Sequence, residues 1–174
     1  MPQNLEMNNL LQLAELPYFE VRENRLKLKP EFGPILDMHA HLALAFLFPH
    51  SVNLLKEWPQ TYYYLPQDKP FSLQKYTSHN ISPKDLKRCK RDLTLFGLTP
   101  WGMRKTHTLP NLYRDMMDTG VEKTLLLAID HPLISHNSEA YLRACRNRNE
   151  FVVFGSVHPL TPKIERRIDK LIKM

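Results

Sequence analysis

The sequence has few cysteines and no long apolar run, and these absences exclude several classes of protein. Cys89 and Cys145 are its only cysteines, so the chain has neither a disulfide framework nor a CxxC metal knuckle, and we expect a reducing, cytoplasmic compartment. The longest apolar run, Leu42 to Phe48, has seven residues, whereas a membrane-spanning helix needs about 20. The first residues lack a basic region and a small-residue cleavage site, so no signal peptide is predicted.

Motifs for nucleotide cofactors and for a nucleophilic serine are absent as well. The chain contains no GxGxxG, no phosphate-binding loop and no GxSxG sequence. Its composition, with 43% hydrophobic and 24% charged residues, is that of an ordinary globular domain. The 24 Lys and Arg residues outnumber the 18 Asp and Glu residues, and this net charge of +6 favours anionic partners without bearing on the fold.

The stretch from Ile35 to Leu42, ILDMHAHL, is the most informative part of the sequence. It is a short apolar run that ends in two histidines two residues apart, His39 and His41. Because side chains in a strand repeat with a period of two, we expect both imidazoles on one side of the strand, with Asp37 behind them. Two imidazoles on one face can bind a single divalent metal ion, and zinc is a common choice.

Strands and helices alternate regularly from Thr106 onward. Residues 124–129 and 151–157 are unalternating apolar runs, typical of parallel strands that are buried on both faces. Amphipathic helices are predicted over residues 108–120, 137–147 and 162–173. With a first strand over residues 34–38, the order is strand, long insertion, helix, strand, helix, strand, helix. That order predicts a parallel sheet with right-handed crossovers.

Two segments lie outside this alternation. Residues 1–33 form a preamble, in which we predict a short helix from Asn9 to Leu16 and a hairpin that turns at Glu23 and Asn24. Residues 42–103 form an insertion, or lid, that prolines break up. Insertions of this length are often lids or binding loops.

A basic helix is predicted inside the insertion, from Ser82 to Gly97. Ser82 suits the N-cap position and Pro83 the first helical position. The cations of this helix are mixed with Asp85 and Asp92. The mixture predicts a solvated helix face, and nucleic-acid binding is the less favoured interpretation.

The predicted fold class is α/β. Three β/α units are the beginning of a TIM-like (β/α)₈ barrel or of an open α/β sheet. A complete barrel needs about 250 residues, and only three units fit here beside the preamble and the insertion. We therefore expect a partial TIM-like (β/α) barrel with about three β/α units and a long insertion after strand 1. Residues 1–174 would be the N-terminal portion of this barrel.

Ionisable residues follow each predicted strand. In parallel α/β folds the active site lies at the carboxyl ends of the strands, which here hold His39 and His41, then Asp130 and His131, then His158. A catalytic metal site needs three or more protein ligands, and His39 and His41 supply two. Asp130 and His158 are candidate substrate-binding residues, with loop capping as the alternative role.

Ile35 to Leu42 resembles the first-strand motif of the amidohydrolase superfamily. Further likeness comes from Asn137 and from the stretches Gly120 to Leu127 (GVEKTLLL) and Arg148 to Pro159 (RNEFVVFGSVHP). Together these residues look like the amidohydrolase-2 branch, which includes the aminocarboxymuconate-semialdehyde decarboxylase-like enzymes. The resemblance covers about residues 34–174, apart from the insertion. TatD-like nucleases share the HxH sequence and a His-Pro after strand three, so they remain a rival family.

This resemblance implies a TIM-like barrel with a divalent metal, commonly zinc, for which His39 and His41 match the first two ligands. Members hydrolyse C–N, C–O or related bonds, or decarboxylate aromatic or conjugated acids. The family's further ligand histidine comes from a middle strand and its catalytic aspartate from the last strand. Both are expected beyond Met174, so no catalytic residue is assigned within the chain.

The expected function is that of a metal-dependent hydrolase of the amidohydrolase type, in which metal-activated water attacks a C–N or C–O bond of a small-molecule substrate. Three alternatives stay open: a decarboxylase of the same branch, a TatD-like nuclease, and an inactive truncated or split fragment that acts only through a partner. The expected protein partner is a second copy, in a homo-oligomer, or a complementary half of the barrel. An incomplete barrel exposes strand edges, which favour pairing. No membrane partner is expected.

Overall fold

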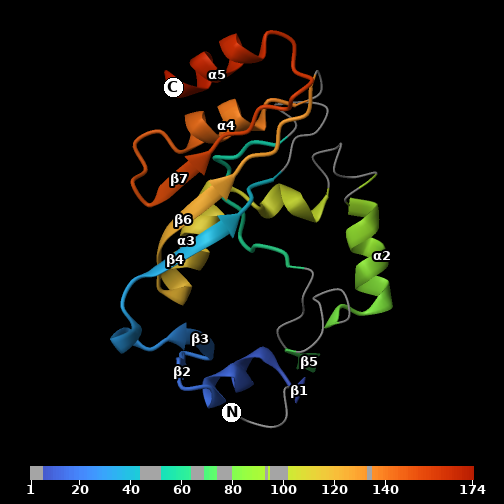
Figure 1. Cartoon of the computed structure of the whole chain (residues 1–174). Helices are drawn as coiled ribbons and strands as arrows, with labels where there is room; N and C mark the ends of the chain where they lie inside the picture. The colour runs from blue at the N-terminus through green and yellow to red at the C-terminus, as the bar shows by residue number, and fades with distance from the viewer. Residues whose placement is uncertain are drawn as a thin grey trace.

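The computed structural model describes residues 6–43, 52–63, 69–73, 80–92, 94, 102–132 and 135–174. Its centre is a parallel sheet of three strands in the order β4–β6–β7, formed by Ile35–Ala40, Val121–Leu127 and Phe151–Phe154 (Figure 1). The helices that follow these strands are α3 (Leu109–Thr119), α4 (Asn137–Ala144) and α5 (Ile164–Ile172). The α/β class and the predicted alternation of strands and helices are therefore confirmed.

The core lies on one face of the sheet, between the strands and the helices α3 and α4. Leu126 of β6 and Phe151 of β7 contribute to it from the sheet. The helical side supplies four further buried residues, Leu109, Met116, Tyr141 and Cys145. Burial of this apolar surface holds both helices against the same face. A doubly wound sheet, by contrast, carries helices on both faces.

The opposite face of the sheet is largely uncovered. Leu36 and Met38 of β4 are 52% and 61% exposed, and Val152 and Phe154 of β7 are 42% and 52% exposed. Along β7 these exposed side chains alternate with the buried Phe151 and the half-buried Val153. The prediction that residues 151–157 form a strand buried on both faces is therefore wrong. An apolar run shows that both faces are hydrophobic, but it does not show that the same chain covers both.

The sheet is open within the part of the chain that the structure describes. β6 lies between β4 and β7, and each of these outer strands pairs on one side only. The described residues therefore form no closed barrel, and the predicted partial TIM-like barrel stays a proposal. None of the described helices is both long and apolar enough to cross a membrane.

The preamble forms small elements near the N-terminus, at the bottom of Figure 1. β2 (Phe19–Arg22) and β3 (Arg25–Leu28) pair as an antiparallel hairpin. Its turn residues Glu23 and Asn24 have φ angles of 53° and 59°, as a type I′ turn requires, so the predicted hairpin is confirmed. The predicted short helix is a 3-10 helix, η1 (Leu10–Glu15), which follows the N-cap residue Asn9.

The described parts of the insertion include two short elements, β5 (Phe71–Ser72) and α2 (Pro83–Arg91). β5 pairs with β1 (Glu6–Met7) of the preamble, and the 3-10 helix η4 (Met103–Thr106), which begins at the last residue of the insertion, precedes α3. The basic helix α2 begins after Ser82 as predicted. Most of its predicted extension to Gly97 lies outside the described residues.

Residues 52–63 pack against the beginning of α3. The N–H of Leu109 donates to the carbonyl oxygen of Leu54 over 2.9 Å. The side chain of the buried Asn111 accepts a hydrogen bond from the N–H of Trp58, also over 2.9 Å. This part of the insertion is therefore joined to the α/β core.

Candidate metal centre

His39 and His41 lie side by side, as the spacing predicts. Their Nε2 atoms are 3.0 Å apart, and their ring centroids are 4.9 Å apart at an interplanar angle of 78°. Two imidazole nitrogens that each bind one zinc ion at about 2.1 Å are separated by about 3.0–3.4 Å. The 3.0 Å distance between the two Nε2 atoms therefore fits binding of one zinc ion by both rings.

An irregularity in β4 accompanies this arrangement. The register between β4 and β6 shifts between Asp37 and Ala40, as at a β-bulge. Bulges redirect side chains and are common next to active sites. The carboxylate of Asp37 accepts a hydrogen bond from the backbone N–H of His39 over 3.0 Å. Asp37 therefore supports the backbone of the irregular segment.

The tautomer of His41 follows from its contact with the neighbouring strand. Nδ1 of His41 lies 2.7 Å from the carbonyl oxygen of Leu127, at the end of β6. A carbonyl oxygen only accepts, so Nδ1 carries the hydrogen and Nε2 of the neutral ring keeps its lone pair. Metal-binding histidines are commonly oriented in this way by a backbone carbonyl. Nε2 of His41 is then the acceptor in its 3.0 Å contact with Nε2–H of His39, a hydrogen bond that a shared metal ion would replace.

The chain after His41 is fixed by a buried tyrosine. The hydroxyl of Tyr141 on α4 donates to the carbonyl oxygen of Leu42 over 2.8 Å. Burial raises the pKa of Tyr141, so its hydroxyl stays a neutral donor. The N–H of Ala43 also donates to the carbonyl oxygen of His107, over 2.7 Å. Sequence reasoning missed the positioning role of Tyr141, because a tyrosine on an apolar helix face carries no sign of its distant partner.

Asp130 follows β6 and is buried. One carboxylate oxygen accepts a hydrogen bond from the N–H of Ser138 over 2.8 Å, and the other pairs with Arg167 over 3.3 Å. These contacts match the capping role considered from the sequence, because Asp130 satisfies a free N–H in the first turn of α4. Its role as a substrate-binding residue stays a prediction.

His158 follows β7 and lies beside His131. The two rings are stacked, with centroids 6.3 Å apart and an interplanar angle of 28°. Nδ1 of His158 accepts a hydrogen bond from the N–H of Leu160 over 3.2 Å. The structure therefore brings together the histidines that follow two neighbouring strands, and substrate binding by His158 stays a prediction.

The histidine pair has two of the ligands that a metal centre requires. Among the described residues, no group of three or more His, Cys, Asp or Glu side chains is placed to hold a metal ion. A catalytic metal site uses three or more protein ligands. The described residues thus supply fewer ligands than such a site needs, and metal binding by His39 and His41 stays a prediction.

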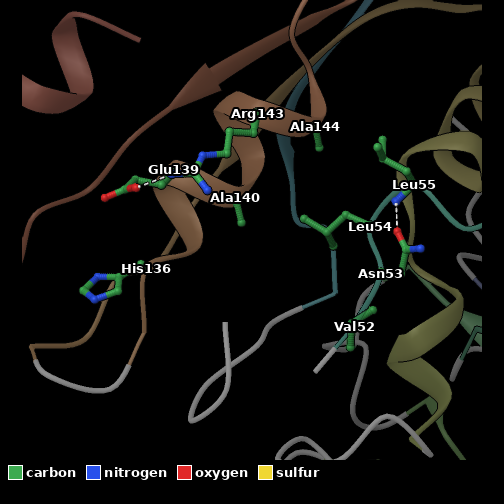
Figure 2. A pocket seen from close by; sticks show the side chains of 9 residues that line it. All are labelled: Val52, Asn53, Leu54, Leu55, His136, Glu139, Ala140, Arg143 and Ala144. Carbon is green, nitrogen blue, oxygen red and sulfur yellow. Dashed lines mark hydrogen bonds and ion pairs between the residues drawn. The ribbon is translucent and has the colours of Figure 1, made fainter. Parts of the chain in front are cut away.

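A pocket of about 570 Å³ lies between residues 52–55 and α4 (Figure 2). An ion pair between Glu139 and Arg143, at 3.1 Å, forms part of its wall. The lining residues are Val52, Asn53, Leu54, Leu55, His136, Glu139, Ala140, Arg143 and Ala144. The predicted site residues His39, His41, Asp130 and His158 are not among them, so this pocket is distinct from the candidate metal centre.

Comparisons of the chain with protein-family models, with curated proteins and with solved structures found no match. The resemblance to amidohydrolases accordingly stays a prediction from the residues of the sequence.

Proposed function

We propose that this chain provides the metal-binding part of a metal-dependent hydrolase of the amidohydrolase type. The observation that supports this most directly is the 3.0 Å distance between the Nε2 atoms of His39 and His41, with the His41 tautomer set by Leu127. A bound divalent metal, with zinc as the first choice, would supply Lewis acidity that activates water and polarises a carbonyl oxygen. The proposed reaction is hydrolysis of a C–N or C–O bond in a small molecule.

The residues of the chain have separate roles in this proposal. His39 and His41 hold the metal, and the carbonyl of Leu127 keeps the His41 lone pair directed away from β6. His158, which also follows a strand of the parallel sheet, is proposed to contact the substrate. The contacts of Asp130 favour a role in positioning α4. The thiols of both cysteines are free, in keeping with a cytoplasmic enzyme.

The fold in this proposal is a partial TIM-like barrel. Three observations support it: the sheet order follows the chain, α3 and α4 cover one face, and the other face exposes Leu36, Met38, Val152 and Phe154. In a barrel that second face is the filled interior. We therefore propose that a complementary β/α half, or a second copy of the chain, covers this face and supplies further metal ligands.

A second candidate function follows from the same uncovered face. The chain would then be an inactive fragment that acts only by docking to its partner. Exposed strand edges and an exposed apolar face favour such association. Size measurement combined with zinc titration of the isolated chain separates the two functions. A clean monomer that binds zinc tightly would count against the docking fragment.

The activity test uses the zinc-loaded assembly of the chain with its proposed partner, either a complementary β/α half or a second copy of the chain. Turnover is measured on small amides and esters, on conjugated carboxylic acids and on single-stranded DNA. Hydrolysis of the first group supports the proposal, whereas release of carbon dioxide or cleavage of DNA supports the decarboxylase or the TatD-like nuclease. His39→Ala should lower turnover by more than about a hundredfold, and the exposed His136→Ala serves as the control. An assembly that holds zinc but does not distinguish these variants would contradict the proposed function.

A further inference from the structure

The exposed face of α2 is strongly cationic. Lys84, Lys87, Arg88 and Arg91 follow the spacing i, i+3, i+4 and i+7, which places them along one side of the helix. All four are exposed, as is Lys90 beside them. At a rise of about 1.5 Å per residue, the row of cations is about 10 Å long. We refer to these five residues as the α2 cationic face.

The acidic residues next to the α2 cationic face have their own contacts. The carboxylate of Asp85 accepts a hydrogen bond from the hydroxyl of Ser82 over 2.6 Å, at the start of the helix. Asp92 is buried, and its carboxylate accepts from the N–H of Met103 over 2.8 Å. The sequence predicts mixed charges on one solvated face, but the structure directs Asp92 inward and ties Asp85 to the N-cap. Between Lys84 and Asp92, five cations and two carboxylates leave a net formal charge of +3.

Aromatic side chains are linked to the C-terminal end of α2 through η4. The contact of Asp92 with Met103 joins the end of α2 to η4, whose Lys105 lies 4.9 Å from the ring centroid of Trp58. Lys56 approaches the same ring at 3.9 Å. The hydroxyl of Thr106 in η4 accepts a hydrogen bond from the N–H of Tyr62 over 3.1 Å. The contacts of η4 thus link the C-terminal end of α2 to residues 56–62, which carry a second group of cations and aromatic rings.

The two rings of this group that are most open are Tyr62 and Tyr63. Tyr63 lies 6.1 Å from His107, and the hydroxyl of Tyr63 contacts the carboxylate of Asp115. Burial of the hydroxyl, followed by that contact, raises the pKa of Tyr63, so the ring stays uncharged. Uncharged, exposed aromatic rings near lysines are the usual stacking platforms for unpaired bases.

We propose that the α2 cationic face, together with η4, Tyr62 and Tyr63, binds single-stranded nucleic acid through its phosphates and bases. Cations along one helix face complement a phosphate backbone, and aromatic rings favour single strands over duplexes. A membrane surface fits less well. Membrane-binding helices place apolar side chains beside their cations, whereas Leu86 and Cys89 of α2 are half-buried. None of these residues is a candidate metal ligand, and the proposed binding needs no metal.

The test is fluorescence anisotropy with labelled single-stranded oligothymidylate and oligouridylate, in EDTA so that metal has no influence. A variant with Lys84→Gln, Lys87→Gln and Arg88→Gln is compared with one carrying Lys123→Gln, Arg166→Gln and Lys173→Gln. Both variants lose the same charge from exposed positions, but only the first alters α2. The α2 variant should bind more than about tenfold more weakly than the wild type, and its salt slope should fall by about 2. The control variant should stay within about threefold of the wild type.

Three results would overturn the proposal. Equal weakening in both variants would mean that net charge alone attracts the oligonucleotide. Equal affinity for a duplex of the same length would contradict the role of Tyr62 and Tyr63, which Tyr62→Ser tests separately. The third result is displacement of the labelled oligonucleotide by phosphatidylserine vesicles as effectively as by unlabelled oligonucleotide. That result would show that the surface binds membranes. Far-UV circular dichroism confirms that each variant is folded.

Discussion

Nδ1 of His41 lies 2.7 Å from the carbonyl oxygen of Leu127, so the ends of two neighbouring parallel strands are joined through an imidazole ring. The contact defines the proton position on His41 and leaves its Nε2 lone pair beside Nε2 of His39. The metal binding that we propose for the HxH sequence would therefore depend on β6 as well as on β4. This arrangement supports the proposed function, and three further features of the fold give predictions of their own.

The one-sided sheet predicts different effects for two phenylalanines of β7. Phe151→Ala removes a buried ring from the core and should lower the free energy of unfolding by about 3–5 kcal/mol. Phe154→Ala removes an exposed ring and should lower it by less than about 1 kcal/mol. Urea unfolding of the dilute monomer measures both values. Similar losses in the two variants would mean that the second face of the sheet is also covered.

The contact between α4 and α5 predicts that Arg167 is important for stability. Its guanidinium pairs with the carboxylates of Asp130 and Glu139, and all three side chains are largely buried. Arg167→Ala would leave two buried carboxylates without this partner and should lower the free energy of unfolding by about 3 kcal/mol. The exposed neighbour Arg166 provides the control, because Arg166→Ala should change the value by less than about 0.5 kcal/mol. Equal effects in chemical unfolding would refute the role of the ion pairs.

Burial of Cys145 predicts a loss of stability in alkali. Burial raises the pKa of this thiol from 9.0 to about 12. Above about pH 9 the unfolded chain releases the proton that the folded chain retains, so the free energy of unfolding falls by about 1.4 kcal/mol per pH unit. The stability that the protonated Cys145 thiol contributes to the folded state is fully present below about pH 9 and is lost as the pH rises towards 12.

Comparison of urea midpoints at pH values between about 8 and 10 tests this prediction. In Cys145→Ala the urea midpoint should fall less steeply between about pH 8 and 10 than in the wild type. This difference in slope is expected even if the variant is less stable at neutral pH. Cys89→Ala should flatten the decline less, because Cys89 is only half-buried and burial raises the pKa of its thiol by less than that of Cys145. A decline in Cys145→Ala as steep as that of the wild type would assign the effect to other groups.

Local patterns in the sequence were enough to predict much of the fold. The hairpin at Glu23 and Asn24, the cap at Ser82 and the alternation from Thr106 onward depend on near neighbours in the chain. The side-by-side placement of His39 and His41 also follows from a local period of two. These features were predictable because each is determined by residues a few positions apart.

The remaining features depend on contacts between distant residues. The hydrogen bond from Tyr141 to Leu42 and the ion pair from Arg167 to Asp130 link separate elements. No local pattern indicates such partners. The open face at Phe154 was missed for a related reason, since an apolar strand has the same sequence whether its second face is covered or not.

Zinc binding to the purified chain tests the central claim most directly. A chromogenic chelator competes for the metal, and the wild type is compared with His39→Ala, His41→Ala and the control His136→Ala. We predict that each of the first two substitutions weakens zinc binding by more than about tenfold, whereas the control binds as the wild type does. Zinc binding that is unchanged in both His39→Ala and His41→Ala would contradict a metal centre at the end of β4.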